Sequence, residues 1–269
     1  MKTILLPTDF SDASRFASEH IFQLNQGNNV KYHLIHSYDP PSSTGALISI
    51  DDIVKKDAEA CIREEIEWMV SIGINRDRIT SDVFFGEFNV VVNREAEKIG
   101  ADYIVLGTTG ASGIKEIIGS NASNLIKSAS IPVLGVPLNA SHNSNGKILF
   151  PVNLSEENDF SSLPLLKEFA KINNVTIEIF YASIPGSDNY TVIEKQKIDL
   201  QRVLKGSILE FRIEQCKDVS FRILELIEEG NYSMLAMMPH KYGILKRLFK
   251  SSVTSKIAMK TSIPLLGIH

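Results

Sequence analysis

Three glycines follow a short apolar run in the first half of the chain, at Gly107, Gly110 and Gly113. Glycine has no Cβ atom, so a loop of this kind can adopt positive φ and bring backbone N–H groups close to an anion. Successive amides of this type form a concave site for phosphate. The spacing therefore predicts a phosphate-binding loop that begins at Gly107.

A second anion-binding signal lies a few residues downstream, where Gly119, Ser120 and Asn121 precede a predicted helix. The first turn of a helix has free N–H groups and the positive end of the helix dipole, and the Ser120 hydroxyl can donate a further hydrogen bond. Each signal alone is more often an ordinary turn or a helix cap. Together they indicate two phosphate contacts in one crevice.

No catalytic constellation accompanies these loops. The six histidines are not paired at metal-ligand spacing, and their positions support no Ser–His–Asp arrangement. Nothing fits the Walker pattern G-x4-G-K-[ST], so common kinase and GTPase interpretations fail. Asp9 is expected to position a ligand rather than to act as a base, and His36 to be a hydrogen-bonded residue at the rim of the crevice. A dedicated enzyme is not expected, although the sequence leaves enzymatic activity open.

Strands and helices alternate in the predicted first half. Apolar runs predict strands at 3–7, 30–37, 79–85, 103–106 and 133–136. Helical spacing predicts helices at 12–24, from 51 to the glycine at 73, at 89–99 and around 125–128. This alternation indicates an α/β fold, with a parallel sheet that has helices on both faces. Ligands bind such sheets at the carboxyl ends of the strands, where Asp9 and Gly107 lie.

The second half of the chain repeats the first. KTILLPTDFS at 2–11 returns as KILFPVNLS at 147–155, and SIPVLGVP at 130–137 returns as SIPLLGIH at 262–269. The strands predicted for the repeat are 148–151, 175–181, 209–215, 234–237 and 265–268. The polar, turn-rich segment 139–146 reads as a linker. We therefore predict two tandem domains, 1–138 and 147–269, each an open five-stranded parallel sheet.

Charge and composition exclude several classes of partner. Lys and Arg number 28 against 32 Asp and Glu, a net charge of -4, which provides no electrostatic attraction for nucleic acid or an acidic membrane surface. Cys61 and Cys216 are expected to be reduced thiols in the core. The chain enters a strand at once and has no apolar run of membrane-spanning length, so a cytoplasmic location with no membrane contact is expected.

Four segments together resemble the universal stress proteins, in the tandem form with two such domains in one chain: Pro7-Thr8-Asp9-Phe10-Ser11, Leu34-Ile35-His36-Ser37, Gly107-Thr-Thr-Gly110 and Gly119-Ser120. The resemblance covers nearly all 269 residues and implies the adenine nucleotide alpha-hydrolase-like fold. It also implies a stress-response protein that binds ATP or another adenine nucleotide in the first domain, acts as a sensor or regulatory module, and holds any magnesium ion through the phosphates.

The family's nucleotide-binding members use a G-x2-G-x9-G-[ST] loop for the phosphates. Carried over by position, the resemblance places near the nucleoside Pro7, Asp9 and Ser37. Around the phosphates it places Gly107, Gly110, Gly119, Ser120 and Asn121. In this chain the residues between Gly110 and Gly119 are 111–118, one fewer than the family pattern.

The second half departs further from the pattern. Asn153 replaces the aspartate, and the stretch aligned with the first loop reads Met237-Met-Pro-His240, which brings side chains and a proline where glycine allowed close approach. The second domain is therefore expected to support structure or regulation. Two alternatives to nucleotide binding remain: a nucleotide-free interaction scaffold and a slow ATPase.

The last strand of each half is the best-preserved part of the repeat. An apolar strand at a sheet edge needs cover, because its exposed amides and carbonyls pair readily with another chain. In the family the last strands pair across the domain dimer, so the resemblance implies an intramolecular pseudo-dimer formed in the same way. A homodimer of the whole chain also remains open.

Overall fold

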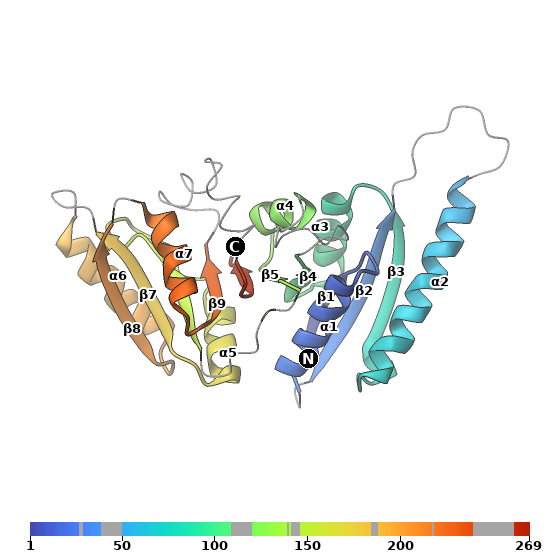
Figure 1. Cartoon of the computed structure of the whole chain (residues 1–269), viewed down its shortest axis with the longest axis horizontal. Coiled ribbons are helices and arrows are strands. Elements are labelled where there is room, and N and C mark those ends of the chain that lie inside the picture. Colours follow the sequence, from blue (N-terminus) through green and yellow to red (C-terminus); the bar gives the residue numbers. More distant parts are fainter. Residues whose placement is uncertain are drawn as a thin grey trace. The chain divides into compact units, whose positions relative to one another are not determined.

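The short apolar runs of the first half form buried parallel strands, as their pattern predicts. The structure is a computed structural model that describes residues 1–26, 29–38, 50–108, 120–138, 140, 146–183, 188–216, 218–238 and 261–269 (Figure 1). These residues divide into two compact units, one formed by residues up to 138 and one by residues from 140 onward. The domain boundaries 1–138 and 147–269 remain predictions.

The first unit begins with a strand and alternates strands with helices throughout. Its elements are β1 (Lys2–Pro7), α1 (Asp12–Leu24), β2 (Val30–Tyr38), α2 (Ile50–Ser71), the short 3-10 helix Arg76–Arg78, β3 (Ile79–Phe85), α3 (Phe88–Ile99), β4 (Tyr103–Gly107), α4 (Ser120–Ser128) and β5 (Val133–Val136).

The second unit has the same alternation. Its elements are β6 (Lys147–Pro151), α5 (Pro164–Asn173), β7 (Ile177–Ser183), α6 (Tyr190–Val203), β8 (Leu209–Gln215), α7 (Val219–Glu229), β9 (Tyr232–Met237) and β10 (Leu265–Gly267). The predicted strand at 175–181 lies two residues later than expected, and β9 begins two residues earlier.

The strands of the two units follow one order. It is β3-β2-β1-β4-β5 in the first unit and β8-β7-β6-β9-β10 in the second, with parallel pairing in each unit. Right-handed crossovers in this order place α1 and α2 on one face of the first sheet and α3 and α4 on the other. The predicted α/β class, with two five-stranded parallel sheets, is confirmed.

Local capping explains where the helices of the first unit begin. The Ser11 side chain accepts a hydrogen bond from the N–H of Ser14 at 3.3 Å, so α1 begins at Asp12 as predicted. The carboxylate of Glu87 accepts from the N–H groups of Asn89 and Val90, and α3 therefore begins one residue before the predicted start. The adjacent strand residues Ile4 and Leu5 point to opposite faces of the sheet and have no exposed surface, so helices cover both faces at this point.

Gly107 ends β4 where the backbone of α1 passes closest to the sheet. A Cβ atom on this residue would lie 2.4 Å from the carbonyl carbon and oxygen of Ala13 and 2.7 Å from the nitrogen of Ser14. Real Cβ atoms do not approach backbone this closely, so any side chain here must push the first turn of α1 away from the sheet. Gly107 is not among the residues with positive φ. Its lack of a side chain is therefore explained by helix–strand packing.

The second unit has no glycine at the position that corresponds to Gly107, and strand pairing there differs from the sequence alignment by one residue. Leu106 pairs with Gly135 on β5, and Met237 pairs with Gly267 at the matching place on β10. Met237 is thus the counterpart of Leu106, not of Gly107 as the alignment predicted, and Met238 takes the place of the glycine. The alignment is wrong here because both segments are continuous apolar runs, which fit a buried strand in either register.

The first helix of the second unit begins further along the chain after its strand than α1 does after β1. Residues 8–11 separate β1 from α1, whereas residues 152–163 separate β6 from α5. A methionine at the place of Gly107 leaves no room for a helical turn packed as α1 is packed. The chain between β6 and α5, residues 152–163, is irregular instead.

Replacing Gly107 with alanine tests this packing. We expect Gly107→Ala to lower the free energy of unfolding by about 1–3 kcal/mol, because the new methyl group meets helix backbone rather than a movable side chain. Chemical denaturation of the full chain measures the change. Gly100→Asn is the matched control: Gly100 has φ of 62° and nothing within 4 Å of an added Cβ, and asparagine tolerates that conformation. Equal stability of Gly107→Ala and the wild-type chain would contradict the account.

Candidate functional site

The carboxyl end of β1 forms a tight turn that leads into α1. The N–H of Thr8 still donates to the carbonyl of Ile35 at 2.8 Å, which ties the turn to β2. Asp9 is exposed, and its Oδ1 accepts from the N–H of Ser11 at 3.1 Å and from the Ser11 hydroxyl at 2.5 Å. One oxygen of the Asp9 carboxylate therefore shapes the turn while the residue stays open to solvent.

His36 supports this turn from the neighbouring strand. Its Nδ1 lies 2.8 Å from the carbonyl oxygen of Thr8, and its ring packs on Phe10 with 4.5 Å between centroids. Phe10 has φ of 63°, an unusual conformation for an aromatic residue, and the ring contact helps to hold it. The prediction that His36 is a hydrogen-bonded residue of the rim is confirmed.

Two further residues that were predicted to lie near the nucleoside, Pro7 and Ser37, lie at the same edge of the first sheet. Pro7 is buried as the last residue of β1 and pairs with Ile35. Ser37 is half-buried on β2, two residues beyond that pair, and lies opposite Phe84 of β3. Because β1 and β2 are parallel, Pro7, Asp9 and Ser37 gather at one end of the sheet.

Only some of the residues that were predicted to contact phosphate lie within the described part of the chain. Gly107 ends β4 opposite Val136, at the same sheet edge. Ser120 is the first residue of α4, and Asn121 is exposed in its first turn. Gly110 and Gly119 lie outside the described residues. Both ends of the predicted loop therefore lie within the described residues. A phosphate-binding role for Gly110 and Gly119 remains a prediction.

Sequence reasoning missed a buried ion pair behind this edge. Glu65 of α2 is 1% exposed, and its Oε2 accepts a hydrogen bond from Nε of Arg15 at 2.8 Å. Burial raises the pKa of Glu65, the hydrogen bond and charge of Arg15 oppose that shift, and the charge of Asp9 adds to it. Helical spacing could have found this residue, because Glu65 falls on the same face as the buried Ile62, Ile66 and Met69.

The matching edge of the second unit keeps the turn but not its charge. Oδ1 of Asn153 accepts from the N–H and the hydroxyl of Ser155 at 3.2 and 2.8 Å, the same pattern that Asp9 forms with Ser11. An amide oxygen therefore suffices to build the turn. The negative charge of Asp9 is therefore not needed to form this turn.

Polar side chains of the second unit satisfy one another at this edge. The Asn158 side chain donates to the carbonyl of Asn153 at 2.8 Å and to Oε1 of the buried Gln196 at 2.9 Å. At the register position of His36 stands Tyr181, which is 1% exposed and donates to Asp188 at 2.6 Å. A ligand entering here would have to displace these internal hydrogen bonds.

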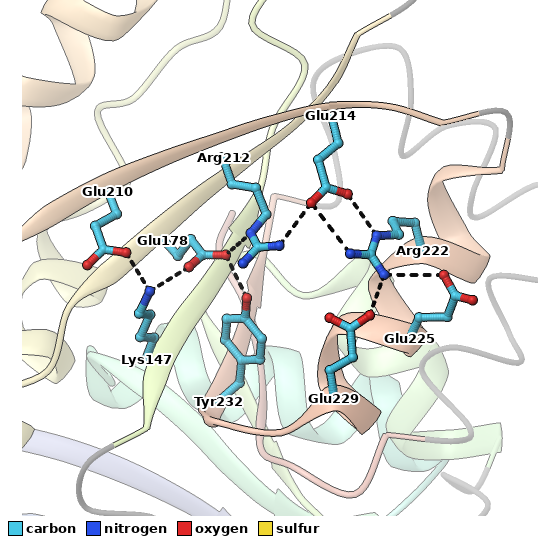
Figure 2. Close-up of polar contacts among 9 residues, drawn as sticks. All are labelled: Lys147, Glu178, Glu210, Arg212, Glu214, Arg222, Glu225, Glu229 and Tyr232. Carbon is cyan, nitrogen blue, oxygen red and sulfur yellow. Dashed lines mark hydrogen bonds and ion pairs between the residues drawn. The ribbon is translucent and has the colours of Figure 1, made fainter.

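A charged cluster lies elsewhere in the second unit and joins four strands to one helix. Figure 2 shows its members: Lys147, Glu178, Glu210, Arg212, Glu214, Arg222, Glu225, Glu229 and Tyr232. Glu178 of β7 is 2% exposed; its Oε1 accepts from Arg212 at 2.7 Å and from the Tyr232 hydroxyl at 2.6 Å, and its Oε2 from Lys147 at 2.8 Å. Arg222 of α7 binds Glu214 at 2.8 Å and Glu229 at 2.6 Å.

The charged cluster borders a hollow of about 390 Å³ lined by Lys147, Glu178, Glu210, Phe211, Arg212, Ile213 and Glu214. Each charged residue in this lining already has a partner of opposite charge, including Glu210, which binds Lys147. A charged ligand would have to break one of these pairs to bind. The cluster is therefore a network that joins β6, β7, β8, β9 and α7, and it holds no free catalytic group.

Electrostatics around Glu178 give the network a defined pH dependence. Burial alone raises the pKa of Glu178, but hydrogen bonds from Lys147 and Tyr232 outweigh burial and hold the pKa below its usual value of 4.5. The pKa of Tyr232 is raised, first by burial and then by its hydrogen bond to Glu178. A carboxyl group with a lowered folded pKa stabilises the fold above its unfolded pKa, and this contribution is lost as the pH falls through the folded pKa.

The first unit is similar to a known family of proteins. The model of the universal stress protein family matches residues 1–137, half of the chain. Universal stress protein G of Escherichia coli O157:H7 is 36% identical over 141 residues, which cover 50% of this chain and 98% of that protein. Universal stress protein MJ0531 of Methanocaldococcus jannaschii is 30% identical over 143 residues, which cover 50% of this chain and 81% of that protein. The chain belongs to the universal stress protein family.

A solved structure matches both units at once. The universal stress protein from Archaeoglobus fulgidus covers 98% of this chain and 97% of its own, with a TM-score of 0.71 and 20% sequence identity. This likeness shows the fold, and it supports the tandem two-domain form that the internal repeat indicates. Among the described residues, no helix is long and apolar enough to cross a membrane, and no group of three or more His, Cys, Asp or Glu side chains is placed to hold a metal ion.

Glu178→Gln tests the network. We expect this change to lower the free energy of unfolding by about 2–4 kcal/mol above pH 5, because Lys147 and Arg212 lose a buried partner. The difference from the wild-type chain should begin to shrink below the usual carboxyl pKa of 4.5 and be lost as the pH falls through the still lower pKa of the folded wild-type carboxylate.

Denaturant unfolding over a series of pH values measures this effect. Glu210→Gln is the matched control, since Glu210 is half exposed and binds the same lysine; its loss should cost at most about 1 kcal/mol. Equal effects of the two substitutions, or a difference that does not depend on pH, would argue against a buried network centred on Glu178.

Proposed function

We propose that the first unit binds an adenine nucleotide, ATP in the first instance, and that the chain works as a sensor or regulatory module of the stress response. The observation that carries this proposal is the contrast between Asp9 and Asn153. Both build the same turn, but the turn-forming residue is an exposed carboxylate in the first unit and an uncharged amide in the second. Ligands of open parallel sheets bind at that edge.

The nucleoside end of the proposed site consists of Pro7, Asp9 and Ser37. Asp9 offers a carboxylate to the hydroxyl or amino groups of the nucleoside, and the half-buried Ser37 offers a hydroxyl from the neighbouring strand. His36 and Phe10 hold the turn in place between them. The rigid support of these residues favours a defined orientation of the bound ligand.

The phosphate end of the proposed site runs from Gly107 to the start of α4. Ser120 and Asn121 form the first turn of this nine-residue helix, where free N–H groups and the helix dipole favour a phosphate oxygen. Gly110 and Gly119 supply the intervening backbone amides in this proposal. A magnesium ion, where one is bound, is carried in by the phosphates.

We further propose that the two units associate through their last strands, β5 and β10. Each is the last strand at one edge of its own five-stranded order, and each carries the repeated sequence Ser-Ile-Pro followed by apolar residues. An edge strand of this composition needs a partner. Such a pseudo-dimer gives ligand binding in the first unit a route to influence the second.

A nucleotide-free scaffold is the second candidate function. It is favoured by the position of Gly107, because packing against α1 fully accounts for the absence of a side chain there. In this alternative the first unit has lost its ligand as the second has, and both act as surfaces for protein partners.

Two measurements separate the candidates. Freshly purified chain is denatured and the supernatant chromatographed for released nucleotide, and Mg-ATP is titrated into the native chain by calorimetry. The proposal predicts released adenine nucleotide or a saturable binding isotherm. Absence of both would overturn the proposed nucleotide binding and favour the scaffold.

Gly110→Leu tests the phosphate loop directly. A branched side chain at this position blocks the approach of the backbone amides to phosphate, so the affinity for Mg-ATP should fall by at least about tenfold. His240→Leu places the same side chain in the segment that follows β9 in the second half, and should leave the affinity unchanged. Unaltered affinity of Gly110→Leu would place the nucleotide elsewhere.

A further inference from the structure

β8 is the outer strand of the second unit. It pairs with β7 in one continuous register, residues 177–183 with 209–215, and with no other strand of the described chain. No proline interrupts it. The outward N–H and C=O groups of such a strand are open to pairing with another chain. β8 therefore offers an uninterrupted edge.

Pairing with β7 decides which backbone groups of β8 face outward. The N–H of Ile177 donates to the carbonyl of Ile208 at 2.9 Å. Backbone groups alternate in direction along a strand, so the even-numbered residues of β8 turn theirs toward β7 and the odd-numbered residues turn theirs outward. An antiparallel partner strand must bond those outward groups. A second copy of β8 can therefore pair only odd-numbered residues with odd-numbered residues.

Charges of alternating sign occupy one face of β8. Glu210, Arg212 and Glu214 leave the strand on the same side, as Figure 2 shows. Charges on an edge strand ordinarily oppose pairing with another chain. In an antiparallel pair centred on Phe211, however, Glu210 of each copy faces Arg212 of the other. The alternation thus makes β8 complementary to a second copy of itself.

Both side chains keep an atom for this contact. Arg212 binds Glu178 through Nε and Glu214 through Nη1, and its Nη2 has no partner in the described part of the chain. Glu210 binds Lys147 through Oε2, and its Oε1 is likewise unpaired among the described residues. A ligand with a single charge would disturb these pairs, but a second β8 brings both charges and uses only the remaining atoms.

One other register would also set unlike charges against each other. In a pair centred on Ile213, Arg212 of each copy would face Glu214 of the other. Both oxygens of Glu214 already accept hydrogen bonds, from Arg212 at 2.9 Å and from Arg222 at 2.8 Å. The register centred on Phe211 is therefore favoured.

The favoured register also covers apolar surface. Ile213, which is 46% exposed, faces Leu209 of the second copy, and the two Phe211 side chains meet at the centre. The outer strand of the first unit, β3, differs, because its one charged residue is Asp82 and it has no basic residue to oppose that charge. Self-complementarity thus belongs to β8 and not to the matching strand of the first unit.

We propose that two copies of the chain associate through antiparallel pairing of β8 with β8, centred on Phe211. The partner is a second copy of this chain, and the contact extends the sheet of the second unit. This surface is separate from the proposed nucleotide site and from the last strands β5 and β10. The inference therefore does not depend on the proposed function.

Sedimentation of the full chain at concentrations up to about 1 mM tests the proposal and should show a reversible dimer. Glu210→Lys sets a lysine against Arg212 twice in each dimer, so Kd should rise by at least about tenfold. Phe85→Lys is the matched control, since Phe85 is a 60% exposed residue of β3, and should leave Kd unchanged. A monomer throughout the range, or a dimer that Glu210→Lys does not weaken, overturns the inference.

Introduced cysteines test the register. In a chain with Cys61→Ser and Cys216→Ser, Phe211→Cys should form an intermolecular disulfide on mild oxidation, because directly opposite Cα atoms lie about 5.5 Å apart. Ile213→Cys in the same background places its two sulfhydryl groups about 13 Å apart along the strands and should crosslink at least about tenfold more slowly. Equal rates, or faster crosslinking of Ile213→Cys, overturn the inference. Thermal unfolding shows whether Glu210→Lys is folded; where it is not, these rates decide.

Discussion

The contact between the end of β4 and the first turn of α1 is the constraint on which the first unit depends. Gly107 lies so close to the backbone of Ala13 that a Cβ atom would come within 2.4 Å of it. This approach fixes where α1 begins, and the start of α1 in turn fixes the turn formed by Asp9 and Ser11. The exposed carboxylate, the ring contact of Phe10 with His36 and the buried pair of Glu65 and Arg15 all depend on that helix position.

The second unit shows what the same topology becomes without this contact. Met238 stands at the place of the glycine, α5 begins only after residues 152–163, and the polar groups at the matching edge bind one another. The second unit is stabilised instead by the charged cluster around the buried Glu178. There the Coulomb attraction of several partners offsets the cost of burying a carboxylate. The first unit thus has an exposed carboxylate at Asp9, and the second has a network of paired charges around Glu178.

Much of the fold could be predicted from the sequence, because apolar runs and helix caps are local signals. The order of strands and helices, the start of α1 close to Ser11 and the position of Asp9 at the carboxyl edge of the sheet follow from such signals, whereas Pro7 and Ser37 are assigned to the site by the resemblance. The counterpart of Gly107 could not be predicted, since strand pairing rather than side-chain pattern sets the register of Met237. The partners of Glu178 also could not be predicted, because they come from strands far apart in sequence. The alternation of Glu210, Arg212 and Glu214 indicates a charged face of β8 but does not identify the residues that pair with it.

Together these contrasts support the proposal that one of the two similar units binds a nucleotide. Native mass spectrometry of the full chain with increasing Mg-ATP counts bound ligands per chain and so tests this claim most directly. The account predicts a single added nucleotide that saturates with no second addition. Two nucleotides per chain, or none at any concentration up to the millimolar range, would contradict it.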